Sequence, residues 1–310
     1  MNSVMHRLPV RTIAAVCFLM GAAHPLLAQG GLRYTVQVLK FENRAGWSAQ
    51  WDLGEAWEAV LSEELNKSGN FIVIAGTDAR KASMDEQDFA QSGRAASGDK
   101  GPKTGFMTPA QLIVTGTIDS FDDGTEGRGS SASYRGIGLR FKGGTSIIGG
   151  TVSFVDATTG QEIASHRFEE KVKNKGVKLS YSKWGFYGDV DAFRKTPSGK
   201  VIAKACDNVL GFLAGQLDNV IWTGKVIRAD SGRIMINRGT REGVSEGQIL
   251  KVGYSEEIRD PDTGELLDLD LTEKGRIRVK TVKEKLSICE PISVDGKKPY
   301  KPKQGQTVFN

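Results

Sequence analysis

The stretch with the strongest claim to chemistry is rich in glycine and basic: YRGIGLRFKGGTSIIGG, from Tyr134 to Gly150. Loops that bind phosphate place backbone N–H groups at the start of a helix, and a P-loop ends in Gly-Lys-Ser or Gly-Lys-Thr. Neither GTSIIGG nor GIGLRFKGG has that ending or the GxGxxG spacing, and a strand pattern follows. We therefore expect no nucleotide site here, and we interpret the glycines as places where a strand bends or packs closely.

Other residue types that catalyse reactions or bind metals are scattered. DPDTGE, residues 260–265, lacks the spacing and final glutamate of an EF-hand loop, so a β-turn is expected. After residue 28 the only histidine is His166, in the alternating strand pattern EIASHRFEEK. Cys206 and Cys289 could pair in an oxidising compartment, but the helical pattern around Cys206 favours a buried free thiol. With no acid–base pair, nucleophile or metal cluster in view, we expect no enzyme, no metal and no cofactor.

The N-terminus has the pattern of an export signal. Arg7 and Arg11 precede the apolar run TIAAVCFLMGAA, and Ala28 offers a small residue before cleavage. The run is too short to span a bilayer, and Cys17 lies inside it, so a lipoprotein signal is not expected. Residues 1–28 hold two of the 42 Lys and Arg and none of the 37 Asp and Glu, so 40 remain against 37. That net charge of +3 is too small to indicate nucleic acid as a partner.

Residues 29–221 have the order of an α/β domain. Asp52 with Glu55 is typical of a helix N-terminus, Gly69 of its end, and Gly160 of the turn between two long strands. The predicted strands are 32–43, 71–76, 108–121 and the hairpin 146–172, and the predicted helices are 52–69, 77–93 and 196–220. Two segments rich in glycine and aromatic residues interrupt this order.

Residues 222–310 have a different texture. Short strand patterns alternate with glycine turns, as in GKVIRADSGRIMINRGTREGVSEGQILKVG and GRIRVKTVKEKLSI. This pattern predicts a small all-β domain, a barrel or a sandwich. The expected fold is therefore α+β or α/β followed by a C-terminal β domain.

The order of motifs in the first domain resembles the CsgG family, the outer-membrane curli secretion component. The motifs are VTGTI (Val114 to Ile118), YRGIG (Tyr134 to Gly138) and FVDATTGQEI (Phe154 to Ile163), followed by the helix GKVIAKACDNVLGFL. The resemblance implies a periplasmic α/β domain from which two β-hairpins emerge, here about residues 125–146 and 172–193. It also implies a homo-oligomer whose hairpins combine between subunits into one outer-membrane β-barrel, with envelope assembly or secretion partners.

The alternation within these two segments indicates which residues would face lipid or a neighbouring subunit. In the first, one face carries Ile137, Leu139 and Phe141, and upstream it continues through Gly127, Gly129, Ser131, Ser133 and Arg135. In the second, it carries Val177, Leu179 and Tyr181, and Lys183 interrupts it before Tyr187. Trp184, Phe186 and Tyr187 would form an interfacial aromatic girdle. The alternative is a pair of soluble hairpins.

Two further features depart from the curli protein. The curli protein has a constriction loop between its first strand and first helix, and the connection at that place here, NRAGWSAQWDLG, is shorter. Trp47, Gln50 and Trp51 are the candidate substitutes for the constricting side chains of that loop. The extra domain from Trp222 resembles the C-terminal domain of the flagellar assembly protein T family, on the motifs quoted above and RDPDTGE. The resemblances together imply a non-enzymatic secretion or assembly component at the periplasmic face of the outer membrane. The alternative is a soluble periplasmic adaptor, similar to penicillin-binding-protein activators or flagellar assembly factors.

Overall fold

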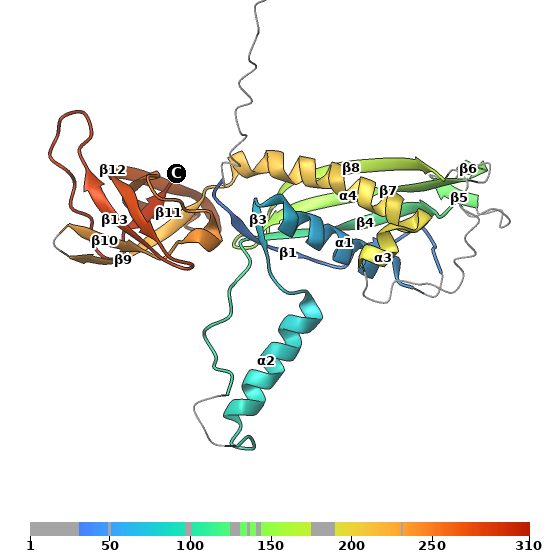
Figure 1. The fold of residues 1–310 in the computed structure, drawn as a ribbon, viewed down its shortest axis with the longest axis horizontal. Coiled ribbons are helices and arrows are strands. Elements are labelled where there is room, and N and C mark those ends of the chain that lie inside the picture. Colours follow the sequence, from blue (N-terminus) through green and yellow to red (C-terminus); the bar gives the residue numbers. More distant parts are fainter. Residues whose placement is uncertain are drawn as a thin grey trace, which may run out of the picture.

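A computed structural model describes residues 31–48, 51–96, 101–124, 131–134, 137–140, 144–174, 190–230 and 232–310, with only the backbone of 131–134 and 137–140. The described chain forms an α/β unit followed by a β unit (Figure 1). The predicted signal segment, residues 1–28, lies outside the described residues.

The α/β unit is built on a mixed sheet of six strands. Its order is β3-β1-β4-β7-β8, and β2 pairs with the middle of β4, at Thr117 and Ile118. β1 is parallel to both β3 and β4, whereas β4, β7 and β8 are antiparallel neighbours. The strands are β1 (Tyr34–Val38), β2 (Glu42–Asn43), β3 (Phe71–Val73), β4 (Leu112–Asp122), β7 (Thr145–Asp156) and β8 (Glu162–Lys173).

Three helices, α1 (Leu53–Ser68), α3 (Val190–Arg194) and α4 (Pro197–Gln216), pack with this sheet. The predicted ends of the first are confirmed: Asp52 accepts a hydrogen bond from the Glu55 backbone N–H at 2.9 Å, and Gly69 adopts φ 76°. Burial of one face then fixes the helices on the sheet. Trp57 of α1 stacks on Phe168 of β8, with ring centroids 4.7 Å apart, and touches Phe41 at 5.3 Å.

The remaining helix, α2 (Thr77–Gln91), stands apart from the sheet and from the β unit (Figure 1). None of its residues is buried. It connects β3 to β4 through the extended segment that returns along residues 101–111. We call residues 77–108 the arm.

The β unit is a closed, entirely antiparallel barrel with the order β10-β13-β12-β11-β14-β9. The predicted fold class, an α+β chain with a C-terminal β domain, is confirmed, and the β domain is a barrel and not a sandwich. The strands are β9 (Thr223–Asp230), β10 (Arg233–Ile236), β11 (Ile249–Arg259), β12 (Leu266–Val282), β13 (Ser287–Ile292) and β14 (Thr307–Phe309), with short 3-10 turns η1 (Leu217–Asn219) and η2 (Thr240–Glu242).

The connection between the two units is pinned from both sides. Tyr34 of β1 donates its hydroxyl hydrogen bond to the Val220 carbonyl at 2.7 Å. Trp222 is fully buried, and the Arg238 guanidinium lies 5.9 Å from its ring centroid. The Arg33 backbone N–H also donates to the Glu242 carbonyl in η2 at 2.9 Å. The core therefore continues from the sheet into the barrel.

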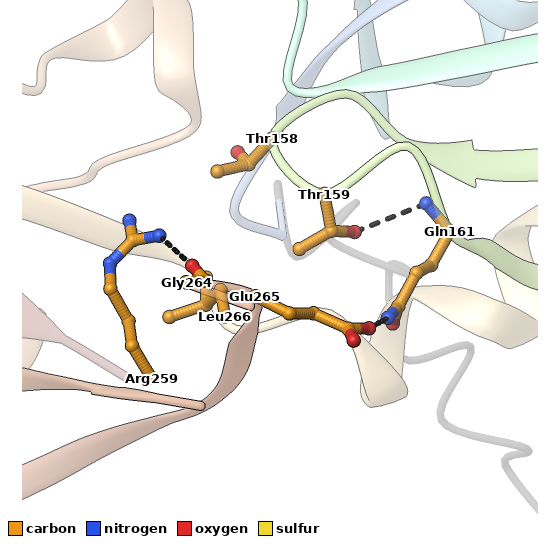
Figure 2. A pocket seen from close by; sticks show the side chains of 7 residues that line it. All are labelled: Thr158, Thr159, Gln161, Arg259, Gly264, Glu265 and Leu266. Carbon is orange, nitrogen blue, oxygen red and sulfur yellow. Dashed lines mark hydrogen bonds between the residues drawn. The ribbon is translucent and has the colours of Figure 1, made fainter. Parts of the chain in front are cut away.

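Two turns with matching geometry form a second contact between the units (Figure 2). In the β7–β8 turn, Asp156 Oδ1 accepts backbone N–H bonds from Thr158 and Thr159 at 2.7 and 3.0 Å. In the β11–β12 turn, Asp260 Oδ1 accepts the equivalent bonds from Asp262 and Thr263, both at 2.8 Å. The two turns meet where Gln161 Nε2 donates to Glu265 Oε1 at 3.0 Å, and a small cleft lies between them. The β-turn predicted for DPDTGE is thus confirmed.

Candidate functional site

The notable site is the end of the sheet from which both predicted hairpin segments continue. The end of β4, the start of β7 and the end of β8 lie side by side there (Figure 1). The ladder extends one step past the strands: Gly144 N–H donates to the Gly124 carbonyl at 3.1 Å, and Asn174 N–H to the Gly144 carbonyl at 2.7 Å. The chain therefore enters residues 125–143 and leaves them at adjacent positions, and residues 175–189 begin at the next.

Polar side chains tie these three strand ends together. Asn174 Nδ2 donates to Ser146 Oγ at 2.7 Å, and Ser146 Oγ donates to the Asp123 carbonyl at 2.7 Å. Ser146 is fully buried, so its hydroxyl, which joins the two hydrogen bonds, is shielded from water. We call residues 122–124, 144–146 and 174 the collar.

Gly124 closes the collar because no other residue fits its position. Its φ is 66°, and a Cβ added there would lie 2.6 Å from the carbonyl carbon of Thr145. Its backbone N–H is bound by Asp122 Oδ1 at 2.8 Å. The turn is thus held at the point where the first segment leaves the sheet.

An aromatic cluster packs beside the collar and includes two of the predicted loop residues. Trp47 and Trp51 lie 5.3 Å apart, and both approach Phe121 of β4 edge-on, at 4.8 and 5.8 Å. Trp51 also meets Phe193 of α3 at 5.3 Å, just after the second segment rejoins the described chain. The loop that was matched to the constriction is therefore held at the same end of the sheet as the collar.

The helix that follows the second segment is anchored by charge. Arg194 of α3 forms ion pairs with Glu63 and Glu64 of α1, the first at 3.4 Å. All three side chains are largely buried, which strengthens the attraction relative to a fully exposed pair. The return point of the second segment is thereby fixed on the helical layer.

Most of the residues predicted to face lipid fall outside the description. Ile137 and Leu139 lie on β6 (Ile137–Arg140), paired with Tyr134 and Ala132 of β5 (Ser131–Tyr134). The alternation expected to continue from Gly127 to Phe141 is wrong at this point, because the chain reverses between 134 and 137. Outside the described residues lie Gln50, Phe141, Val177, Leu179, Tyr181, Trp184, Phe186 and Tyr187. Their roles stay predictions.

Sequence reasoning missed the collar and half of the aromatic cluster. Ser146, Asn174 and Gly124 are small or polar residues common in any loop, and Phe121 and Phe193 read as ordinary core. The signal that could have found them is their position, since each flanks one of the two glycine-rich segments.

The residues first considered for chemistry have structural partners. His166 stacks on Phe212 of α4 at 4.9 Å, and its Nε2 lies 3.1 Å from Asn208 Oδ1. Cys206 and Cys289 are free and buried in different units, and burial raises the pKa of Cys289 to about 12. Within the described ranges no three His, Cys, Asp or Glu side chains gather as a metal site. Among the described helices, none has the length and apolarity to cross a bilayer.

The chain belongs to the CsgG family. A family model described as "Curli production assembly/transport component CsgG" matches residues 23–247, well over half of the sequence. The match covers the whole α/β unit and the first two strands of the barrel. The protein is therefore a component of assembly or secretion in the cell envelope.

The similarity to solved structures is remote. Protein CT253 of Chlamydia trachomatis is 14% identical, with a TM-score of 0.38, over 60% of this chain and 98% of that one. The PelC dodecamer of Paraburkholderia phytofirmans is 14% identical, with a TM-score of 0.28, over 56% and 85%. Lipoprotein GNA1162 of Neisseria meningitidis is 13% identical, with a TM-score of 0.25, over 60% and 96%. Similarities of this size carry no argument about function. No curated protein matches the sequence.

Proposed function

We propose that this chain is a ring-forming, non-enzymatic subunit that serves secretion or assembly of a surface polymer at the outer membrane. Family membership supports the envelope role. The observation that carries the proposal is the collar, where three neighbouring strands end together and both glycine-rich segments begin.

The physical reason lies in the hydrogen bonds of strand edges. A hairpin that leaves a sheet has two edges whose N–H and C=O groups need partners. In lipid no water can supply them, so hairpins must pair with those of neighbouring copies until the array closes. The collar holds the three strand ends in register, so the two hairpins that continue from them would begin side by side with their edges aligned.

The loop with Trp47 and Trp51 fits the same arrangement. Its aromatic contacts with Phe121 and Phe193 anchor it beside the collar. In a ring, one such loop from each copy would lie near the mouth of the central opening. We propose that this loop limits the width of the passage.

The experiment is to express the full chain, separate outer membrane from periplasm, and measure its size in mild detergent. We expect a large, heat-modifiable ring in the outer-membrane fraction. Leu139→Arg and Leu179→Arg should abolish that ring, because an arginine facing lipid at the bilayer midplane costs about 2–4 kcal/mol. The matched control is Gly215→Arg, at an open helix position where an added Cβ meets nothing within 4 Å. A monomer released by osmotic shock would sink the proposal.

A second candidate is a soluble periplasmic adaptor that acts by protein–protein contact. The barrel favours it, because a closed six-stranded barrel is complete in itself and leaves its outer surface for partners. The proposed resemblance of this barrel to the C-terminal domain of the flagellar assembly protein T family belongs with this candidate. Release of a monomer by osmotic shock, with unchanged size after Leu139→Arg, would select it.

A further inference from the structure

The arm lacks the support that a helix of its length needs. An isolated helix of about 12–15 residues is marginal in water, and α2 has 15 residues, none of them buried. Its N-cap, Gly76, makes no side-chain hydrogen bond, and its last turn has no basic residue. Asp85, Glu86 and Asp88 instead place negative charge toward the C-terminal end, against the helix dipole. A cationic partner would cover part of this helix and neutralise the negative charge near its C-terminal end.

One face of α2 is used by the arm itself. Arg80 Nη1 donates to the Thr108 carbonyl at 2.9 Å, and Gln91 Nε2 donates to Thr104 Oγ1 at 3.0 Å. These bonds hold the returning segment of the arm along the helix. On the opposite face, the side chains of Asp78, Asp85 and Phe89 form no hydrogen bond or ion pair with a described residue.

That opposite face is acidic with an apolar edge. Asp78, Asp85 and Phe89 follow one another at i, i+7 and i+11, and Asp88, three residues after Asp85, lies at the side of this face. Lys81 lies between Asp78 and Asp85 and offsets part of their charge. The three carboxylates form no ion pair within the described residues, and Phe89 is 48% exposed. We call Asp78, Asp85, Asp88 and Phe89 the free face.

The barrel carries a surface of opposite charge. Arg276, Arg278 and Lys280 alternate along β12 with Ile277 and Val279, which are buried in the barrel. On the neighbouring strand β11, Ile249 lies opposite Arg278 and Lys251 lies opposite Arg276. Ile249 is 49% exposed. We call Ile249, Lys251, Arg276, Arg278 and Lys280 the strip.

The acids near the strip leave it positive. Glu273 pairs with Arg276 at 2.9 Å, and Glu290 lies 3.5 Å from Lys280. Arg278 lies between Ile249 on β11 and Glu290 on β13, its two cross-strand neighbours, and forms no ion pair within 4.0 Å and no hydrogen bond with a described side chain. The strip thus presents an unpaired guanidinium next to an exposed aliphatic side chain.

We infer that the free face of α2 binds the strip on the barrel of a second copy of this chain. Three unpaired carboxylates and an exposed phenyl ring would meet the Arg278 guanidinium, the other basic groups of the strip and an exposed isoleucine. Within one chain α2 and the barrel strands stand apart (Figure 1), although the base of the arm meets the β unit where Arg241 Nη1 donates to Thr108 Oγ1 at 3.5 Å. A contact between different surfaces of successive copies is head-to-tail, and such contacts generate rings when the rotation closes. The inference rests on the proposed ring and names one of its contacts.

The test uses charge reversal in the full exported chain, with oligomer size measured by sedimentation in mild detergent. The arm variant is Asp85→Lys with Asp88→Lys, and the strip variant is Lys251→Glu with Arg278→Glu. We expect each alone to weaken self-association at least tenfold. Their equimolar mixture, in which every contact again joins opposite charges, should restore the wild-type size. The matched control, Glu246→Lys with Glu256→Lys, changes exposed acids elsewhere on the barrel and should leave the size unchanged.

The outcomes separate this inference from the ring proposal. A wild-type ring that both variants leave intact would overturn the arm contact while the ring stands. A wild-type monomer in detergent and in lipid would end both proposals. A strip variant that loses binding to vesicles containing phosphatidylglycerol, yet keeps its oligomer size, would assign the strip to anionic lipid and overturn the contact with α2.

Discussion

At the residue scale, single positions decide how the two glycine-rich segments leave the sheet. The collar depends on a buried serine hydroxyl, an asparagine amide and one glycine that no L-residue can replace without strain. Gly124 and Gly160 share a positive φ, 66° and 73°, but only Gly124 has backbone atoms close by. Substituting alanine at each position therefore separates the energetic cost of a left-handed backbone from the cost of a clash with neighbouring atoms.

We predict that Gly160→Ala lowers the free energy of unfolding by about 1 kcal/mol, the cost of a left-handed backbone for alanine. Gly124→Ala should lose about 1–3 kcal/mol more, because its methyl group would also displace the Thr145 backbone. Urea unfolding of both variants measures the difference. Equal losses would show that the close approach at the collar relaxes without cost.

At the element scale, the base of the arm meets α1 through a carboxylate. Glu58 of α1 approaches Gly76, the N-cap residue of α2. Burial, with the charges of Asp78 and Glu55, raises the pKa of Glu58 above its ordinary 4.5. Glu162 on β8 is the opposite case, since hydrogen bonds from Ser153 and Ser165 lower its pKa.

The two glutamates should respond to pH with opposite sign. A raised pKa means that the folded state favours the protonated form, so the stability from Glu58 is lost as pH rises above about 4.5. Glu58→Gln should therefore be more stable than wild type at pH 7. A lowered pKa means that the folded state favours the ionised form, so Glu162 stabilises the folded state when the pH is above 4.5, its ordinary pKa. Glu162→Gln should therefore be less stable than wild type at pH 7. Urea unfolding at pH 7 and pH 3 tests both differences, which should vanish at the lower pH. A less stable Glu58→Gln at pH 7 would contradict this account.

At the scale of the whole molecule, the two units share one core. Trp222 lies at their junction and is fully buried, with the Arg238 guanidinium above its ring. Tyr34 donates a hydrogen bond to the nearby Val220 carbonyl. The paired turns at Gln161 and Glu265 brace the units at a second point. We therefore expect the α/β unit and the barrel to unfold together.

Calorimetry of two tryptophan variants tests this coupling. Replacing a buried tryptophan by alanine costs about 3–5 kcal/mol. Trp57→Ala, inside the α/β unit, should lower the temperature of a single transition. Trp222→Ala should split that transition into two, because the junction loses its packing. Two transitions in the wild-type chain would show that the units are independent.

The sequence by itself determined the features that depend on neighbouring residues. The caps of α1, the turn at Gly160, the turn at Asp260 and the alternation of the strands follow from side chains a few positions apart. The same reasoning failed at β5 and β6, because an even spacing of small residues looks alike in one strand and in two that reverse. Local patterns thus yielded the α/β unit, the β domain and the absence of any familiar catalytic motif.

Only the tertiary structure decided which distant residues meet. Ser146 lies 23 positions from its acceptor and 28 from Asn174, and Gln161 and Glu265 are 104 apart. No local preference of serine, asparagine or glutamine signals such a partner, because pairing is set by how the strands assemble into the sheet. The same assembly left α2 outside the core, although its sequence predicts a helix in the same way as that of α1. The collar, the aromatic cluster and the exposed arm could therefore be identified only in the tertiary structure. The packing of the helices on the sheet decides which side chains find partners and which stay exposed.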